Sequence, residues 1–142
     1  MNIIREEEAA MNSQVAVLLA EGFEDIEAVT VIDVLRRAGV VVSVTGVDCD
    51  SDGLVCSSHD LCLKTDCLLE DLDITDLEML VFPGGLPGAT NLAASEEARL
   101  LARTVHDRGG WVAAICAAPI ALSAAGLLKG MEYTCYPSFE KK

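Results

Sequence analysis

The feature that most constrains this chain is a stretch of twenty uncharged residues, GGWVAAICAAPIALSAAGLL, at positions 109–128. Its length would suit a membrane span. Two glycines at its start, a proline and a high share of alanine make it only weakly hydrophobic, which argues against a span. We predict instead a central strand, WVAAI, followed by a helix from about residue 117 to 125 that is buried on all sides. Cys116 then lies at the strand-to-helix junction.

The rest of the chain alternates between strand and helix patterns. Nearly continuous apolar runs predict buried strands at 14–20, 40–47 and 77–82. Regularly spaced polar residues predict a helix over 25–38, and Ser95 is placed to cap another helix that ends at Gly109. Residues 54–63 fit either a short hairpin or irregular strands, residues 64–76 are ambiguous, and 132–136 predict a further strand. This alternation predicts an α/β domain with a mostly parallel, doubly wound sheet.

The charge of the chain restricts its partners. Asp and Glu number 23 against 10 Lys and Arg, which gives a formal net charge of −13. An acidic surface repels phosphate backbones and anionic lipid, so we predict neither nucleic acid nor membrane as a partner. Residues 1–13 lack the features of a signal or transit peptide, so we predict a loose leader, one domain over 14–142, and a cytoplasmic location.

Six cysteines raise the question of disulfides and metals. In a reducing cytosol we predict that all six are thiols. Cys56, His59, Cys62 and Cys67 form a cluster, but their spacing does not form the paired knuckles of structural zinc sites. Small apolar cysteines on strands explain the pattern as well, so we predict no metal.

Cys116 is the candidate reactive residue. A strand-to-helix junction resembles a nucleophile elbow, where helix amides and the helix dipole favour a thiolate and a lowered pKa. Ligand sites in open parallel sheets lie outside the carboxyl ends of the strands, where we expect Glu27 to approach this sulfur and the amides of Gly85 and Ala117 to face an oxyanion. The alternatives are a small buried cysteine, a solvated acid at position 27, and an ordinary turn at Gly84–Gly85.

Three segments resemble the ThiJ/PfpI family, the family of the Parkinsonism-associated deglycase. They are LLAEGFEDIEAVTVIDVLRRAG, LVFPGGLPGATNL and VAAICAAPIAL, and the resemblance runs from about residue 14 to 137. It implies a flavodoxin-like sandwich with helices on both faces, a homodimer, and no cofactor. It also implies that Cys116 is the reactive cysteine, that Glu27 hydrogen-bonds its thiol, and that Gly85 and Ala117 supply the oxyanion-hole amides.

Four departures from the family pattern matter. Ala117 stands where the protease-like branch has histidine, which disfavours a Cys–His peptidase. Tyr136 stands where many members carry histidine near the pocket, and His59 falls near the place of an arginine that reaches the partner's site. Together with Gly84, these two residues are candidate pocket residues. The sequence ends at Lys142, before the strand, turn and closing helix of family members, so we expect that last strand and helix to be missing.

Three functions remain open at this level. The first is a glyoxalase- or deglycase-like enzyme that acts on reactive dicarbonyls, such as a small 2-oxoaldehyde, or on their glycated adducts through a Cys116 hemithioacetal. The second is an oxidative-stress sensor or chaperone that works through oxidation of the same thiol. The third is a non-catalytic family member.

Overall fold

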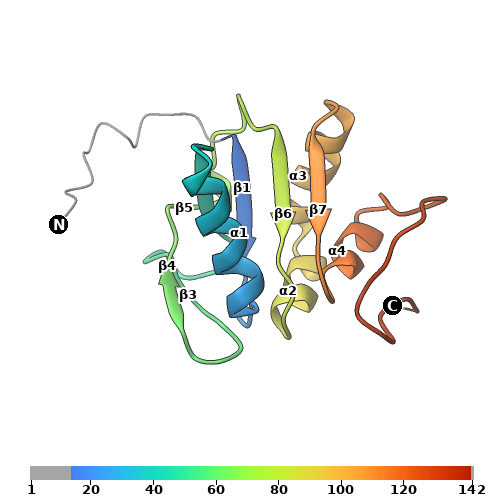
Figure 1. The fold of residues 1–142 in the computed structure, drawn as a ribbon, viewed down its shortest axis with the longest axis horizontal. Helices are drawn as coiled ribbons and strands as arrows, with labels where there is room; N and C mark the ends of the chain where they lie inside the picture. The colour runs from blue at the N-terminus through green and yellow to red at the C-terminus, as the bar shows by residue number, and fades with distance from the viewer. Residues whose placement is uncertain (1–13, 142) are drawn as a thin grey trace.

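The computed structural model describes residues 14–141 and contains a five-stranded sheet with the strand order β5-β2-β1-β6-β7 (Figure 1). All four neighbouring pairs are parallel. The strands are β1 (Val15–Leu19), β2 (Val42–Gly46), β5 (Cys67–Leu68), β6 (Met79–Phe82) and β7 (Trp111–Ala114). The predicted strands at 14–20, 40–47 and 77–82 became β1, β2 and β6, which are continuous apolar runs because both sheet faces are covered.

Helices cover both faces of this sheet (Figure 1). They are α1 (Asp25–Arg37), α2 (Gly88–Ala94), α3 (Glu96–Asp107) and α4 (Pro119–Ala124). On β1, Val15 and Val17 belong to the same buried cluster as Ile32 of α1, whereas Ala16 and Leu18 belong to a second cluster with the other three helices. The molecule therefore has the flavodoxin-like α/β fold that the sequence predicted.

Local signals in the sequence explain the longer helices. The Ser95 hydroxyl accepts a hydrogen bond from the Ala98 amide at 3.4 Å and caps α3, as predicted. The apolar stripe of α3 is buried at Ala98, Leu101, Ala102 and Val105. The short helix α2 was not predicted, because its seven residues begin within the PGGLPG turn and carry no cap.

A small antiparallel hairpin stands apart from the main sheet. It pairs β3 (Leu54–Cys56) with β4 (Cys62–Lys64), and its register places Cys56 opposite Cys62. These two residues form a disulfide, so the prediction of six thiols was wrong. The hairpin alternative for 54–63 was correct, and the ambiguous segment that follows contains the end of β4, β5 and a short 3₁₀ helix, Leu69–Asp71.

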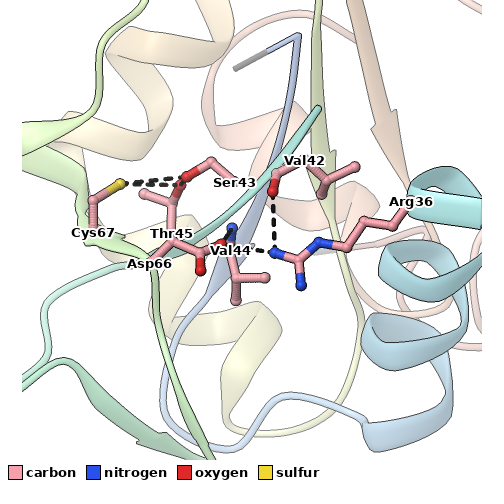
Figure 2. A network of polar contacts seen from close by, with 7 residues as sticks. All are labelled: Arg36, Val42, Ser43, Val44, Thr45, Asp66 and Cys67. Atoms are coloured by element: carbon pink, nitrogen blue, oxygen red, sulfur yellow. Dashed lines mark hydrogen bonds and ion pairs between the residues drawn. The ribbon is translucent and has the colours of Figure 1, made fainter. Parts of the chain in front are cut away.

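A network of polar contacts ties β2 to β5 and to α1 (Figure 2). The Asp66 carboxylate accepts hydrogen bonds from the Val44 amide at 2.7 Å and from the Arg36 guanidinium at 2.9 Å. The Arg36 guanidinium also donates to the Val42 carbonyl at 3.1 Å. These contacts fix the last turn of α1 against the sheet, at the opposite end of the helix from its first turn.

Three predictions about the C-terminal third need correction. β7 is an edge strand of the sheet that residues 14–141 form, not a central one, and its Trp111 is 75% exposed. α4 is shorter than predicted and exposes Ser123 and Ala124, so it is not buried on all sides. Residues 132–136 form no strand, so the strand predicted there from residue types alone was wrong.

The uncharged stretch at 109–128 is therefore an edge strand, a turn and a short helix. Within residues 14–141 no helix has both the length and the apolar character needed to cross a membrane. The predicted leader over 1–13 lies outside the described residues.

Candidate active site

The candidate site lies at the carboxyl ends of three neighbouring strands. β1, β6 and β7 are adjacent and parallel, so the segments that follow them meet at one edge of the sheet. These segments lead into α1, into α2 and into α4. The predicted convergence of the three motifs at this edge is thus present in the structure.

Cys116 occupies the turn between β7 and α4. Its φ is 60°, a left-handed conformation that costs a non-glycine residue energy. The turn is closed by a hydrogen bond from the Ala118 amide to the Ile115 carbonyl at 3.0 Å. The side chain is half-buried, neither locked in the core nor fully in solvent. This geometry is the strained strand–turn–helix elbow that the sequence predicted.

Three groups lie beside the Cys116 sulfur and influence its pKa, namely the Glu27 side chain and the backbone amides of Ala117 and Gly85. The Glu27 Oε2 atom also accepts a hydrogen bond from the Gly84 amide at 2.8 Å. The structure therefore brings together Cys116, Glu27, Gly85 and Ala117. Two amides and one carboxyl group around one sulfur can stabilise negative charge beside that sulfur and move a proton to or from it.

The close approach of these groups requires glycine at position 84. A Cβ atom there would touch Glu27 Oε2 and would lie 2.8 Å from the Cys116 Cβ. Gly85 is constrained differently, because its φ of 91° is in the left-handed region and a Cβ would lie 2.6 Å from the Phe23 carbonyl carbon. The two glycines let backbone, rather than side chains, line the site.

The charge state of Cys116 differs from the sequence prediction. Burial raises the pKa of the Cys116 thiol, and Glu27 raises it further through its hydrogen bond and its charge. The amides of Ala117 and Gly85 act in the opposite direction but do not reverse the shift. The expectation of a lowered pKa and a resting thiolate was wrong, because it counted the helix amides and left out desolvation and the adjacent carboxylate.

A variant of the capping box holds Glu27 in place. The Glu24 side chain accepts a hydrogen bond from the Glu27 amide at 3.0 Å and caps α1. In a standard capping box the Glu27 side chain would return to the Glu24 amide. Here Glu27 binds the Gly84 amide, and the Glu24 amide donates to the Gly84 carbonyl at 3.0 Å. The cap of α1 is thus joined to the turn after β6.

The two remaining candidate pocket residues lie at the margin of the site. The Tyr136 amide donates to the Cys116 carbonyl at 2.7 Å, but the Tyr136 side chain is exposed and packs edge-on against Phe139, with ring centroids 6.2 Å apart. The His59 imidazole pairs with Asp25 Oδ2 at 2.7 Å. His59 thus contacts the first turn of α1, and this turn links His59 to Glu27.

Sequence reasoning missed Glu24 and Asp25. A hydrogen bond from Ser57, helped by His59, lowers the pKa of the Asp25 carboxyl. Glu24, Asp25 and His59 present ligand atoms within 4.8 Å of one another, a donor set that suits a divalent cation. The only available signal for Glu24 was its spacing of three from Glu27, which is that of a capping box.

Comparison with known proteins identifies the family. The DJ-1/PfpI family model matches residues 13–142. The chain belongs to the DJ-1/PfpI family. The resemblance to ThiJ/PfpI proteins is therefore confirmed.

Individual relatives agree with this assignment. The chain is 36% identical to protein dj-1beta of Drosophila melanogaster over 130 aligned residues. The alignment covers 92% of this chain and 68% of that protein. The structure matches oxidized DJ-1 of Toxoplasma gondii with a TM-score of 0.83 and 36% identity, over 89% of this chain and 68% of that one. It also matches a mutant of a DJ-1 superfamily protein from Salmonella typhimurium with a TM-score of 0.83 and 34% identity, over 92% of this chain and 70% of that one. The chain thus spans about two thirds of the length of these relatives.

Proposed function

We propose that this protein is a cysteine-dependent, cofactor-free enzyme that acts on reactive dicarbonyls or their early adducts, in the manner of a glyoxalase or deglycase. The observation that carries the proposal is the position of one half-buried sulfur beside a carboxyl group and two backbone amides, at the turn where Glu27 binds the Gly84 amide. A carbonyl carbon attacked by that sulfur places its oxygen where two amides can stabilise it. No further group is required to begin the reaction.

In the first step the Cys116 thiol transfers its proton to the Glu27 carboxylate as the sulfur attacks the aldehyde carbon of a 2-oxoaldehyde. A carbon–sulfur bond forms, the carbonyl π electrons move to oxygen, and the amides of Gly85 and Ala117 stabilise the oxyanion, which takes the proton from Glu27 to become a hemithioacetal. A thiol with a raised pKa suits this step, because the proton leaves only when the nucleophile attacks. Glu27 serves here as the base.

In the second step Glu27 moves a proton from the former aldehyde carbon to the neighbouring ketone carbon, while the hydroxyl proton of the hemithioacetal passes to the ketone oxygen. The aldehyde carbon is oxidised to the level of a thioester and the ketone is reduced to an alcohol, so electrons balance within the substrate. Water then hydrolyses the thioester, which releases a 2-hydroxy acid and restores the thiol. The net reaction consumes one 2-oxoaldehyde and one water.

Replacement of Cys116 by alanine tests this proposal. We expect Cys116→Ala to reduce methylglyoxal consumption to the rate without protein, because the proposed mechanism uses Cys116 as its covalent nucleophile. Cys49→Ala is the matched control, since Cys49 is also a half-buried thiol whose pKa is raised mainly by burial. Lactate formation measured by chromatography is the readout. Equal rates for Cys116→Ala and the unmodified protein would refute the proposal.

A second candidate function is oxidative sensing, alone or with a chaperone role. It is favoured by the similarity to a Toxoplasma DJ-1 that is described as oxidized. The two amides that would hold an oxyanion can equally hold a sulfinate at Cys116. Mild peroxide should then add two oxygens selectively at Cys116, as peptide mass spectrometry would report. Uniform oxidation of the accessible cysteines would contradict it.

The proposal also includes the oligomeric state, the location and the partners of the protein. A homodimer is supported by exposed large apolar side chains, among them Trp111 at 75% and Ile26 at 72% exposure. Light scattering at several protein concentrations tests it, and a monomeric mass throughout would overturn it. A cytoplasmic location and the absence of nucleic-acid partners rest on the sequence and its charge of −13.

A further inference from the structure

The hairpin disulfide lies where small thiols can reach it. Cys56 and Cys62 face each other across β3 and β4, and Cys62 is exposed whereas Cys56 is half-buried. Exposed disulfides exchange with dissolved thiols more readily than buried ones. In reducing compartments, the disulfides that do form are usually transient and redox-sensing. The position of this disulfide therefore suits reversible chemistry more than permanent stabilisation.

The loop enclosed by the disulfide is fastened to the chain just before α1 and to its first turn. The Ser58 amide donates to the Phe23 carbonyl at 2.8 Å, and the Gly22 amide donates to the Cys56 carbonyl at 2.8 Å. The His59 imidazole pairs with Asp25 Oδ2 at 2.7 Å. Loop 57–61 thus acts as a strap across residues 22–25.

The strapped segment is the one that positions Glu27. Asp25 is two residues before Glu27 in the same helical turn, and Glu24 caps that turn through the Glu27 amide. The Glu24 amide and the Glu27 carboxylate both bind Gly84. A continuous set of contacts therefore runs from the disulfide to the proposed acid–base residue beside Cys116.

The strap depends on the disulfide more than the base of the hairpin does. Each hairpin strand has only three residues, and a two-stranded hairpin is marginally stable by itself. Val55 is fully buried and anchors the base of the hairpin in the core, whereas residues 58–62 are exposed. A disulfide restricts the conformations open to the loop that it closes. Breaking it should free the strap without unfolding the domain.

We propose that Cys56 and Cys62 form a reversible thiol–disulfide modification site that controls how firmly Glu27 is held against Cys116. Two equivalents of a small monothiol reduce it. The S–S bond breaks, Cys56 and Cys62 each gain one electron and one proton, and the monothiol is oxidised to its own disulfide. The consequence for catalysis rests on the proposed function, but the effect on the Cys116 thiol does not.

The test compares oxidised and phosphine-reduced protein by site-resolved alkylation of Cys116. On reduction we expect Cys116 alkylation at neutral pH to become severalfold faster, because Glu27 no longer suppresses its ionisation. Aldehyde consumption should fall about tenfold, because the base is less well placed. Cys56→Ser/Cys62→Ser should behave like the reduced protein in both conditions. The control Cys49→Ser/Cys67→Ser should respond to reduction as the unmodified protein does.

A Glu27→Gln background shows whether the effect passes through Glu27, since reduction should then leave Cys116 alkylation unchanged. The proposal is overturned if intact mass shows no disulfide after oxidation, or if the disulfide is reduced with no change in the Cys116 rate. Failure of the proposed enzyme function would look different. No aldehyde would be consumed in either state, while the change in alkylation would persist.

Discussion

The two sides of the candidate site are built differently. The side that carries Glu27 is held by the capped turn of α1, the strap from the hairpin and the buried loop after β1, where Phe23 is 1% exposed. The side that carries Cys116 follows an edge strand with an exposed Trp111, and its neighbour at residues 131–141 has no regular structure. The Glu27 side chain is thus held by several contacts, whereas the sulfur is positioned mainly by its own strained turn. Changes on the two sides should have unequal effects.

Two substitutions of aromatic residues compare how much each side contributes to the free energy of unfolding. We expect Phe23→Ala to lower the free energy of unfolding by about 3–5 kcal/mol, because it leaves a cavity in the buried side. Trp111→Ala should change it by about 0.5 kcal/mol or less, because that side chain is mostly in solvent. Urea denaturation followed by circular dichroism gives both values. Similar losses for the two variants would show that the sides do not differ as described.

Position 84 tests the contact between the two sides. Gly84→Ala places a methyl group against Glu27 Oε2 and the Cys116 Cβ, so the two groups must move apart. We expect turnover to fall about a hundredfold, as displacements of this size commonly cause. Gly109→Ala is the control, since a Cβ there meets nothing within 4 Å and only its positive φ carries a cost. Retained turnover in Gly84→Ala would show that close approach is not needed.

The polar network of Figure 2 tests whether the far end of α1 also supports the side that carries Glu27. Asp66→Ala removes the acceptor of the Val44 amide and of Arg36, and we expect a loss of about 1.5 kcal/mol in unfolding free energy. Asp33→Ala removes only the exposed pair with Arg37 and should cost about 0.5 kcal/mol or less. Thermal unfolding of both variants provides the comparison. If Asp66→Ala lowered the free energy of unfolding no more than Asp33→Ala does, this network would not support the side that carries Glu27.

The sequence predicted the framework because the framework depends on local patterns. Continuous apolar runs located β1, β2 and β6, and the stripe with its Ser95 cap located α3. The meeting of Glu27, Gly85 and Cys116 followed from the parallel order of three strands, which alternation with helices predicted. These features require only short-range information and one topological rule.

The errors concern features that depend on distant neighbours. The pairing of Cys56 with Cys62 depends on the register of a hairpin across a five-residue loop, which composition does not determine. The strand predicted at 132–136 has suitable residues, but in the structure the Tyr136 amide donates to the carbonyl of Cys116, which lies in a turn and not in a strand. The direction of the Cys116 pKa shift required the depth of the sulfur and the position of the Glu27 carboxylate, and neither can be read from spacing.

The pH dependence of Cys116 alkylation, compared between the unmodified protein and Glu27→Gln, shows whether Glu27 holds this thiol in its protonated form. Because burial and the Glu27 carboxylate raise the pKa of this thiol, the neutral form should persist to higher pH than in a free cysteine. The stability that depends on this neutral thiol is present below the ordinary pKa and is lost as pH rises through the raised value. Cys49 provides an internal control, since burial rather than Glu27 raises the pKa of its thiol.

Glu27→Gln should lower the pKa of Cys116 and speed its alkylation at neutral pH, tenfold for each unit by which the pKa falls. Alkylation of Cys49 should stay the same. Unchanged or slower alkylation of Cys116 in Glu27→Gln would contradict the account, because the sulfur would then not be a thiol that Glu27 holds in its protonated form.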